Sequence, residues 1–456
     1  MNIKSQQAKN SFLFIFIYLC SLSLQPAFAT QSKKVITTDI WAATATVFKL
    51  VGEKAVNNVK LNWMQREDAD LYKIYRDGNC IGEAKGNTYD DYNLKADKTF
   101  TYHVEAFKEG KKIATSASQQ ATTFTPSGET KIYDNLNGKY ITKESIKKPQ
   151  GMKIGDLYFS YKMENVEKEI DGQTLKGWLA TESFSPTGLD GSWSASRELA
   201  FYPNVKFEGI AFRYNAKTGK VVLSAHYEDQ SGYVAAKIYL AQITPKGELE
   251  VGTVERPLGH ESRDQSLFID DDGTAYLLSA TNMNRDINIY KLDTSWTKPV
   301  LLVNTICKGL HRETPAIIKK DGEYYFFSSK ASGWYPSQTM YTSATDLEGE
   351  WTPMREIGNN STFDAQFNRI STVGKTCGVW SYHWGAQRKY KTPDGNFPRI
   401  SIAAFNKGYA SMDYYRYLEF SDKYGIIPVQ NGKNLTLNVP VTAAVPGARG
   451  IKADCI

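Results

Sequence analysis

The chain has 456 residues, a formal net charge of +6 and 41% hydrophobic residues. Acidic and basic side chains are interspersed along it, so the charge forms no basic stripe of the kind that binds nucleic acid. Roughly 425 residues follow the leader described next, and that length exceeds one ordinary domain and predicts two or three.

Residues 1–29 have the pattern of a signal peptide. Two lysines precede an apolar stretch at residues 12–24, which is too short to span a bilayer. Residues 27–29 then read Ala-Phe-Ala, the small-x-small form of a signal-peptidase site. We therefore expect a secreted or periplasmic protein that has no membrane span and is soluble after cleavage. A lipoprotein anchored through Cys20 is the less favoured alternative, because the residues just before it are not small.

Four cysteines remain after cleavage, at Cys80, Cys307, Cys377 and Cys455. They are far apart in sequence, and none has the spacing of a metal site or a redox motif. Export permits disulfides, and Cys307 with Cys377 is the pair to test first, although spacing alone establishes no pairing.

Residues 36–125 are expected to form a small β-sandwich. Apolar and polar residues alternate at 59–63, 71–75 and 100–106, and turn residues recur about every ten positions. The region resembles a fibronectin type III domain through Trp63, residues 75–78 and 89–91, and the strand at 100–106. Phe100 stands where that family usually has its corner tyrosine. The resemblance implies a spacer or docking platform without chemistry of its own.

A linker rich in Thr, Pro, Ser and Gly at residues 123–129 precedes a repetitive region. Strand patterns then recur at roughly 45 to 60 residues, a period typical of propeller blades. The expected blades begin near residues 151, 207, 262, 311 and 366. The fold class predicted here is all-β, with a five-bladed β-propeller over residues 130–440 behind the N-terminal sandwich.

Three of these repeats begin with an acid just ahead of an apolar strand: Glu208, Asp264 and Glu313. A single acid there is an ordinary surface turn residue. Three acids at equivalent points of successive blades would instead converge on the propeller axis. Crowded carboxylates in a partly dry funnel raise at least one pKa, which a general acid requires.

The propeller region resembles glycoside hydrolase family 43 over about 300 residues. The matching motifs are residues 262–264 with 270–276, and residues 311–317 with 322–325. Residues 332–337 and 344–351, and residues 207–208 with 214–220, are similar to the branch that acts on β-1,3-linked galactan.

The resemblance implies a role for each matching residue. Glu313 would be the general acid, Asp264 would tune its pKa and orientation, and Glu208 would bind the sugar at the cleavage site. The aspartate base that most members place on the first blade is missing at residues 148–152, as in the galactan branch. Gln366 would there position the water, and it could act as a base only as its imidic-acid tautomer.

Aromatic residues near the predicted funnel are candidates for stacking on a sugar ring. Trp334 and Tyr335 follow a glycine in a loop, and Trp384 ends the pattern that contains Trp380 and Tyr382. For Trp380 and Tyr382, packing within the blade is the competing interpretation. We expect no cofactor; a structural cation near His226 or His383 stays open, although neither has ligand spacing.

Three functions follow. The first is an exported, inverting glycoside hydrolase, namely an exo-β-1,3-galactanase acting on galactan or arabinogalactan side chains. The second is a non-catalytic carbohydrate-binding propeller, which the missing base favours. The third is a family 43 hydrolase acting on arabinofuranosides or xylosides. In each case the partner is a poly- or oligosaccharide.

Overall fold

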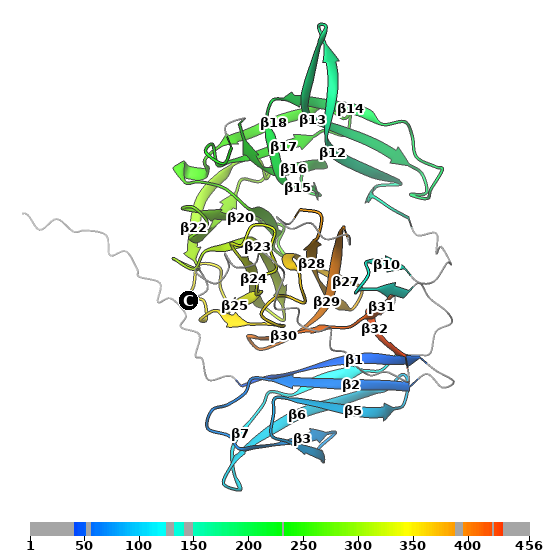
Figure 1. Ribbon diagram of the computed structural model, residues 1–456, viewed down its shortest axis with the longest axis vertical. Coiled ribbons are helices and arrows are strands. Elements are labelled where there is room, and N and C mark those ends of the chain that lie inside the picture. The colour runs from blue at the N-terminus through cyan, green and yellow to red at the C-terminus, as the bar shows by residue number, and fades with distance from the viewer. Residues whose placement is uncertain are drawn as a thin grey trace, which may run out of the picture. The chain divides into compact units, whose positions relative to one another are not determined.

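The computed structural model describes residues 41–51, 56–124, 132–140, 149–229, 232–387, 395–421 and 424–431. The expected signal peptide, Cys20 and Cys455 lie outside these ranges. Within them the chain is almost entirely β-strand, with one 3-10 turn at Pro257–Gly259 and no α-helix (Figure 1). The all-β prediction is thereby confirmed. In the part of the chain described, no helix has the length and apolar character needed to cross a membrane.

Five antiparallel sheets of four consecutive strands each follow one another along the described chain (Figure 1). The first contains β11 (Met152–Ile154), β12 (Leu157–Ile170), β13 (Gln173–Ser185) and β14 (Arg197–Pro203). The second contains β15 (Lys206–Asn215), β16 (Lys220–Glu228), β17 (Lys237–Ile243) and β18 (Leu249–Glu255). The third contains β19 (Gln265–Ile269), β20 (Ala275–Thr281), β21 (Asp286–Leu292) and β22 (Pro299–Ile306). The fourth contains β23 (Arg312–Lys320), β24 (Glu323–Lys330), β25 (Met340–Ala344) and β26 (Arg355–Glu356). The fifth contains β27 (Gln366–Val373), β28 (Thr376–Trp384), β29 (Asn396–Asn406) and β30 (Tyr409–Tyr414).

Four-stranded sheets of this kind fit a blade-based propeller, and their starts agree with the expected repeats to within a few residues. The count of five blades stays a prediction. Neighbouring sheets share apolar clusters: one of them joins Phe268 and Leu278 of the third sheet to Ile317 and Phe326 of the fourth. The repeat therefore arises because each sheet buries its apolar faces against the next.

Local sequence explains the tight turns inside the sheets. The β23–β24 hairpin turns at Asp321 and Gly322, which have φ of 51° and 81°. Positive φ at both central residues is what the right-handed twist of a two-residue hairpin needs, and Asp-Gly supplies it at low cost. By contrast β30, which the sequence analysis did not place, is buried along its whole length and shows no alternation to read.

The N-terminal strands form two sheets. One contains β3 (Leu71–Arg76), β4 (Asn79–Ala84), β6 (Thr99–Lys108), β7 (Lys111–Thr115) and β8 (Gln119–Thr122). The other contains β1 (Ala43–Val51), β2 (Val56–Trp63), β5 (Thr88–Leu94), β9 (Ile132–Asp134), β10 (Lys139–Tyr140), β31 (Tyr417–Ser421) and β32 (Gly425–Asn431). Trp63, Tyr72 and Tyr102 lie at the centre of the apolar core between them. Likeness to a fibronectin type III domain stays a prediction.

Strands from the end of the described chain complete the second of these sheets. β32 pairs in parallel with β1, and β31 pairs with both β32 and β9. Lys60 of β2 also forms a 3.0 Å ion pair with Asp413 of β30. The N-terminal strands are therefore hydrogen-bonded to segments more than 300 residues away, which no local pattern indicated.

The suggested bond between Cys307 and Cys377 is wrong, because both thiols are free. Cys307 follows β22 and its Sγ lies 3.6 Å from Met354 Sδ. Cys377 is buried on β28 in a different apolar cluster. Each thiol is used as a small apolar group in its own sheet.

Candidate active site

A cavity of about 690 Å³ is lined by the first residues of the inner strands of four sheets. Six of the predicted site residues line it: Glu208, Asp264, Glu313, Gln366, Trp334 and Trp384. Tyr335, the seventh, is not among its lining residues, so its expected contact with a sugar is not supported. Gly333 and Trp334 lie in a turn, and the exposed Trp334 lines the cavity.

Irregularities in the backbone direct the side chains of Glu208 and Glu313. The pairing register shifts directly after Glu208 in β15 and directly after Glu313 in β23. The next residue is in the left-handed region in both cases, with φ of 60° for Gly209 and 51° for Thr314. A β-bulge bends a strand and redirects a side chain, and a β-branched residue at positive φ is costly. The same strained feature at both acids is typical of a functional site.

Glu313 has the environment of a carboxylic acid that keeps its proton near neutral pH. Burial, reinforced by the charge of Asp264, raises its pKa to about 8. The Ser332 backbone N–H, the Gln366 amide and the charge of Arg312 oppose that shift. Gln366 Nε2 donates to Oε2 at 3.0 Å, and Asn284 Nδ2 donates to Oε1 at 3.1 Å. The result is an oriented carboxyl group that is acidic enough to give up a proton and still protonated at neutral pH.

Asp264 immediately precedes β19 and supports Glu313 in two ways. Its Oδ2 accepts the backbone N–H of Thr314 at 3.0 Å, which holds the bulge that aims Glu313. Burial raises the pKa of Asp264 too, but the Thr314 amide and nearby His226 oppose the rise. The charge of Asp264 in turn raises the pKa of Glu313, which favours the protonated form of Glu313.

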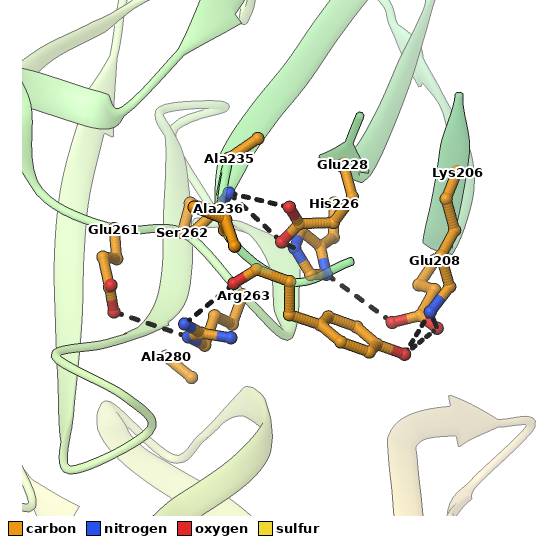
Figure 2. Close-up of polar contacts among 12 residues, drawn as sticks. Lys206, Glu208, His226, Glu228, Ala235, Ala236, Glu261, Ser262, Arg263 and Ala280 are labelled. Carbon is orange, nitrogen blue, oxygen red and sulfur yellow. Dashed lines mark hydrogen bonds and ion pairs between the residues drawn. The ribbon is translucent and has the colours of Figure 1, made fainter. Parts of the chain in front are cut away.

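The surroundings of Glu208 lower its pKa, whereas those of Glu313 raise the pKa of that residue (Figure 2). Its Oε1 accepts the Tyr233 hydroxyl at 2.7 Å and lies 2.9 Å from Lys206 Nζ, while its Oε2 lies 3.7 Å from His226 Nδ1. Burial alone would raise the pKa of Glu208, but His226 and these two partners outweigh burial and lower it to about 2. Glu208 is thus a permanent anion that can accept hydrogen bonds from sugar hydroxyls and is a very weak base.

Gln366, the first residue of β27, joins the fifth sheet to the acid. Its Nε2 donates to Glu313, and its Oε1 accepts the indole N–H of Trp384 at 3.0 Å. Trp384 in turn stacks on Tyr382, with ring centroids 4.7 Å apart and an interplanar angle of 23°. The cavity therefore contains a continuous hydrogen-bonded path from Trp384 to Glu313.

The sequence analysis did not single out Asn284, the second amide on Glu313. Residues 282–284 all have positive φ, between 51° and 61°, so a strained turn carries this side chain. Asn284 Oδ1 and Gln265 Oε1 line the cavity and are buried without a hydrogen-bond partner among the described residues. The only sequence signal for this residue was the run Asn-Met-Asn at residues 282–284, which follows a strand pattern. A run of this kind usually marks a loop.

The two histidines considered as cation ligands are hydrogen-bonded within the fold. His226 Nε2 lies 2.7 Å from Glu228 Oε1, and the Ala236 N–H in turn donates to Glu228 (Figure 2). His383 Nδ1 lies 3.0 Å from the backbone oxygen of Asp364. In the described ranges no group of three or more His, Cys, Asp or Glu residues could hold a metal ion.

Residues 250–374, which contain Asp264 and Glu313, match the family model for glycosyl hydrolases family 43. Asp264 and Glu313 therefore lie in a segment that is similar to glycoside hydrolases of that family. No curated protein matches the chain.

The chain is also similar to two solved structures, each at a TM-score below 0.5. An exo-β-1,3-galactanase from Clostridium thermocellum is 26% identical, with 61% of this chain and 63% of that chain covered and a TM-score of 0.49. An exo-β-1,3-galactanase from Phanerochaete chrysosporium is 23% identical, with 56% and 64% covered and a TM-score of 0.46. The chain thus spans less than two thirds of the length of either protein.

Proposed function

We propose that the protein is an inverting exo-β-1,3-galactanase that removes galactose from β-1,3-galactan or from arabinogalactan side chains. The observation that carries the proposal is the pairing of opposite carboxyl environments on one cavity. Glu313 has a pKa raised to about 8, whereas Glu208 has a pKa lowered to about 2. Carboxyl groups with separated pKa values are the usual sign of an acid and an ionised partner in glycoside cleavage.

The residues then divide the reaction between them. Glu313 protonates the glycosidic oxygen, and Asp264 holds Glu313 in position through Thr314. Glu208 accepts hydrogen bonds from the sugar at the cleavage site, and the unpartnered oxygens of Asn284 and Gln265 can accept others. Trp334, with 49% of its surface exposed at the cavity, provides a face on which a pyranose can stack. Gln366 positions a water molecule, which attacks the anomeric carbon from the opposite face of the sugar ring as the bond to the protonated glycosidic oxygen breaks. The attacking water releases its proton to the solvent, Glu313 takes a proton back from the solvent, and the anomeric centre is inverted.

Galactan is the proposed substrate because of the sequence motifs at residues 207–208, 214–220, 332–337 and 344–351. Two of them contribute to the cavity, one through Phe207 and Glu208 and the other through Gly333 and Trp334. The proposal includes export by the signal peptide, a five-bladed propeller, and a fibronectin type III-like sandwich as the N-terminal module.

A second function is favoured by one specific observation. The carboxylates that line the cavity are Glu208, Asp264 and Glu313, and none of these is free to serve as an ordinary base. A propeller that binds β-1,3-galactan without cleaving it would need no base, and it would keep the same sugar-binding groups.

A product assay separates these functions. The purified protein is incubated with β-1,3-galactan, β-1,3-galactobiose, arabinan and xylan, and released sugars are identified by chromatography with the anomeric form followed by NMR. Release of galactose as the α-anomer from the two galactans supports the proposal. Release from arabinan or xylan would change the substrate, and galactan binding without any release would establish the binding function.

A further inference from the structure

We propose that Trp384 is a positioning residue that fixes the amide of Gln366, and through it the carboxyl group of Glu313. This inference rests on the proposed function of the cavity. It assigns Trp384 a role different from that of a stacking platform, although its ring also lines the cavity.

The orientation of the Gln366 amide follows from the chemistry of its neighbour. An indole N–H can only donate a hydrogen bond, so the atom that faces Trp384 Nε1 at 3.0 Å has to be an acceptor. That atom is Gln366 Oε1, which leaves the NH₂ group facing Glu313 Oε2 at 3.0 Å. The amide therefore has one orientation, and a neutral ring nitrogen determines it.

Rigid surroundings make this orientation permanent. Gln366 is only 5% exposed and begins β27, where it pairs with Tyr382 of β28. Trp384 lies two residues further along β28 and stacks on that same tyrosine. Strand pairing fixes the two backbones, and the hydrogen bonds of Gln366 and the stack of Trp384 on Tyr382 hold the two side chains in place.

Loss of the indole N–H removes the donor that holds Gln366 Oε1 away from Glu313, so the reversed amide orientation becomes available while Glu313 is protonated. In the reversed orientation Gln366 would present its carbonyl oxygen to the Glu313 carboxylate, which repels the ionised form. Glu313 would then be harder to ionise and less well aimed at the glycosidic oxygen. Trp384 therefore acts on the rate and pH dependence of the reaction more than on substrate affinity.

The test compares two aromatic substitutions in one stack. Trp384→Phe keeps an aromatic ring on Tyr382 and at the cavity but has no N–H. Tyr382→Phe is the matched control, because it also removes one polar group from the stack and Tyr382 does not line the cavity. Both variants are assayed on β-1,3-galactobiose from pH 5 to 10.

For Trp384→Phe we expect kcat to fall about ten- to a hundredfold with KM nearly unchanged, and the alkaline limb of the kcat/KM profile to move to higher pH. Tyr382→Phe should keep the wild-type profile. Three results would overturn the inference: a change in KM alone, an unmoved alkaline limb, or an equal loss of kcat in the control.

A second measurement does not depend on turnover. In protein labelled at the glutamate carboxyl carbon, the ¹³C resonance that disappears in Glu313→Gln is followed as a function of pH. Trp384→Phe should raise the pKa of this carboxyl, and Tyr382→Phe should leave it at the wild-type value. If the pKa rises although no glycan is cleaved, the proposed function fails and the positioning role survives. If it does not rise, the positioning role is wrong even in an active hydrolase.

Discussion

Substitution Glu313→Gln should make the protein more stable than the wild type at alkaline pH, at the same time as it abolishes hydrolysis. An acid whose pKa is raised by folding holds its proton more tightly in the native state than in the unfolded chain. The wild type therefore loses stability as the pH rises above the ordinary glutamate pKa of 4.5, and the loss is complete above about 8. Glutamine has no proton to lose, so the variant does not carry this pH-dependent cost.

The size of the effect follows from the shift itself. A pKa of about 8 against the ordinary 4.5 corresponds to about 5 kcal/mol at ~1.4 kcal/mol per pH unit, which is an upper limit. Repulsion by Asp264 is part of the shift, and relaxation of that pair reduces the cost. We expect the stability of the variant, relative to the wild type, to rise by ~2–5 kcal/mol between pH 5 and pH 9.

The assay is urea unfolding at a series of pH values, followed by tryptophan fluorescence and repeated by circular dichroism to test whether the transition is cooperative. Glu248→Gln, which removes an exposed carboxyl from another sheet, is the control for the loss of one charge. A pH-independent offset of about 1 kcal/mol is expected in Glu313→Gln, because its own NH₂ group meets an amide donor of Gln366 or Asn284.

A flat difference between Glu313→Gln and the wild type from pH 5 to pH 9 would refute the raised pKa. The same result would also refute the conclusion that Glu313 holds a proton at neutral pH. A difference that shrinks as the pH rises would mean that Glu313 is stabilised as an anion, like Glu208.

Glu208→Gln should lower kcat/KM about a hundredfold and leave the acid limb of the pH profile in place, because a pKa of about 2 keeps Glu208 ionised throughout the working range. Trp334→Ala should raise KM about tenfold and change kcat by less than about threefold, because loss of an exposed stacking face affects bound substrate and transition state alike; a large fall in kcat would contradict the platform role. Asp413→Asn should lower the Tm by an amount that corresponds to about 1–3 kcal/mol, because it removes the ion pair with Lys60, and an unchanged Tm would show that this contact contributes nothing. Of the three cysteines in the described residues, only the exposed Cys80 should react with a thiol reagent in the native protein, and Cys307 and Cys377 should react on unfolding; a disulfide between those two would leave them unreactive.

The sequence by itself determined the features that depend on short segments. Alternating apolar residues and Asp-Gly turns located the strands, since strand pleat and turn conformation are set by adjacent residues. The repeat of these patterns predicted successive four-stranded sheets. The acids at the start of three repeats, Glu208, Asp264 and Glu313, were readable for the same reason: residues at equivalent points of a repeat meet at one end of the fold.

Only the tertiary structure decided how these residues work. The pKa of Glu208 is lowered by His226, Lys206 and Tyr233, whereas the pKa of Glu313 is raised by burial and by the charge of Asp264. None of these contacts follows from a local pattern.

The same limit explains the residues that the sequence analysis missed or misjudged. Asn284 reaches Glu313 from a strained turn, Tyr335 does not line the cavity, and the amide of Gln366 is oriented by a ring 18 residues away. β32 pairs with β1 across nearly the whole chain. Such features depend on burial, on backbone bulges and on contacts between distant segments, and these exist only once the chain has folded.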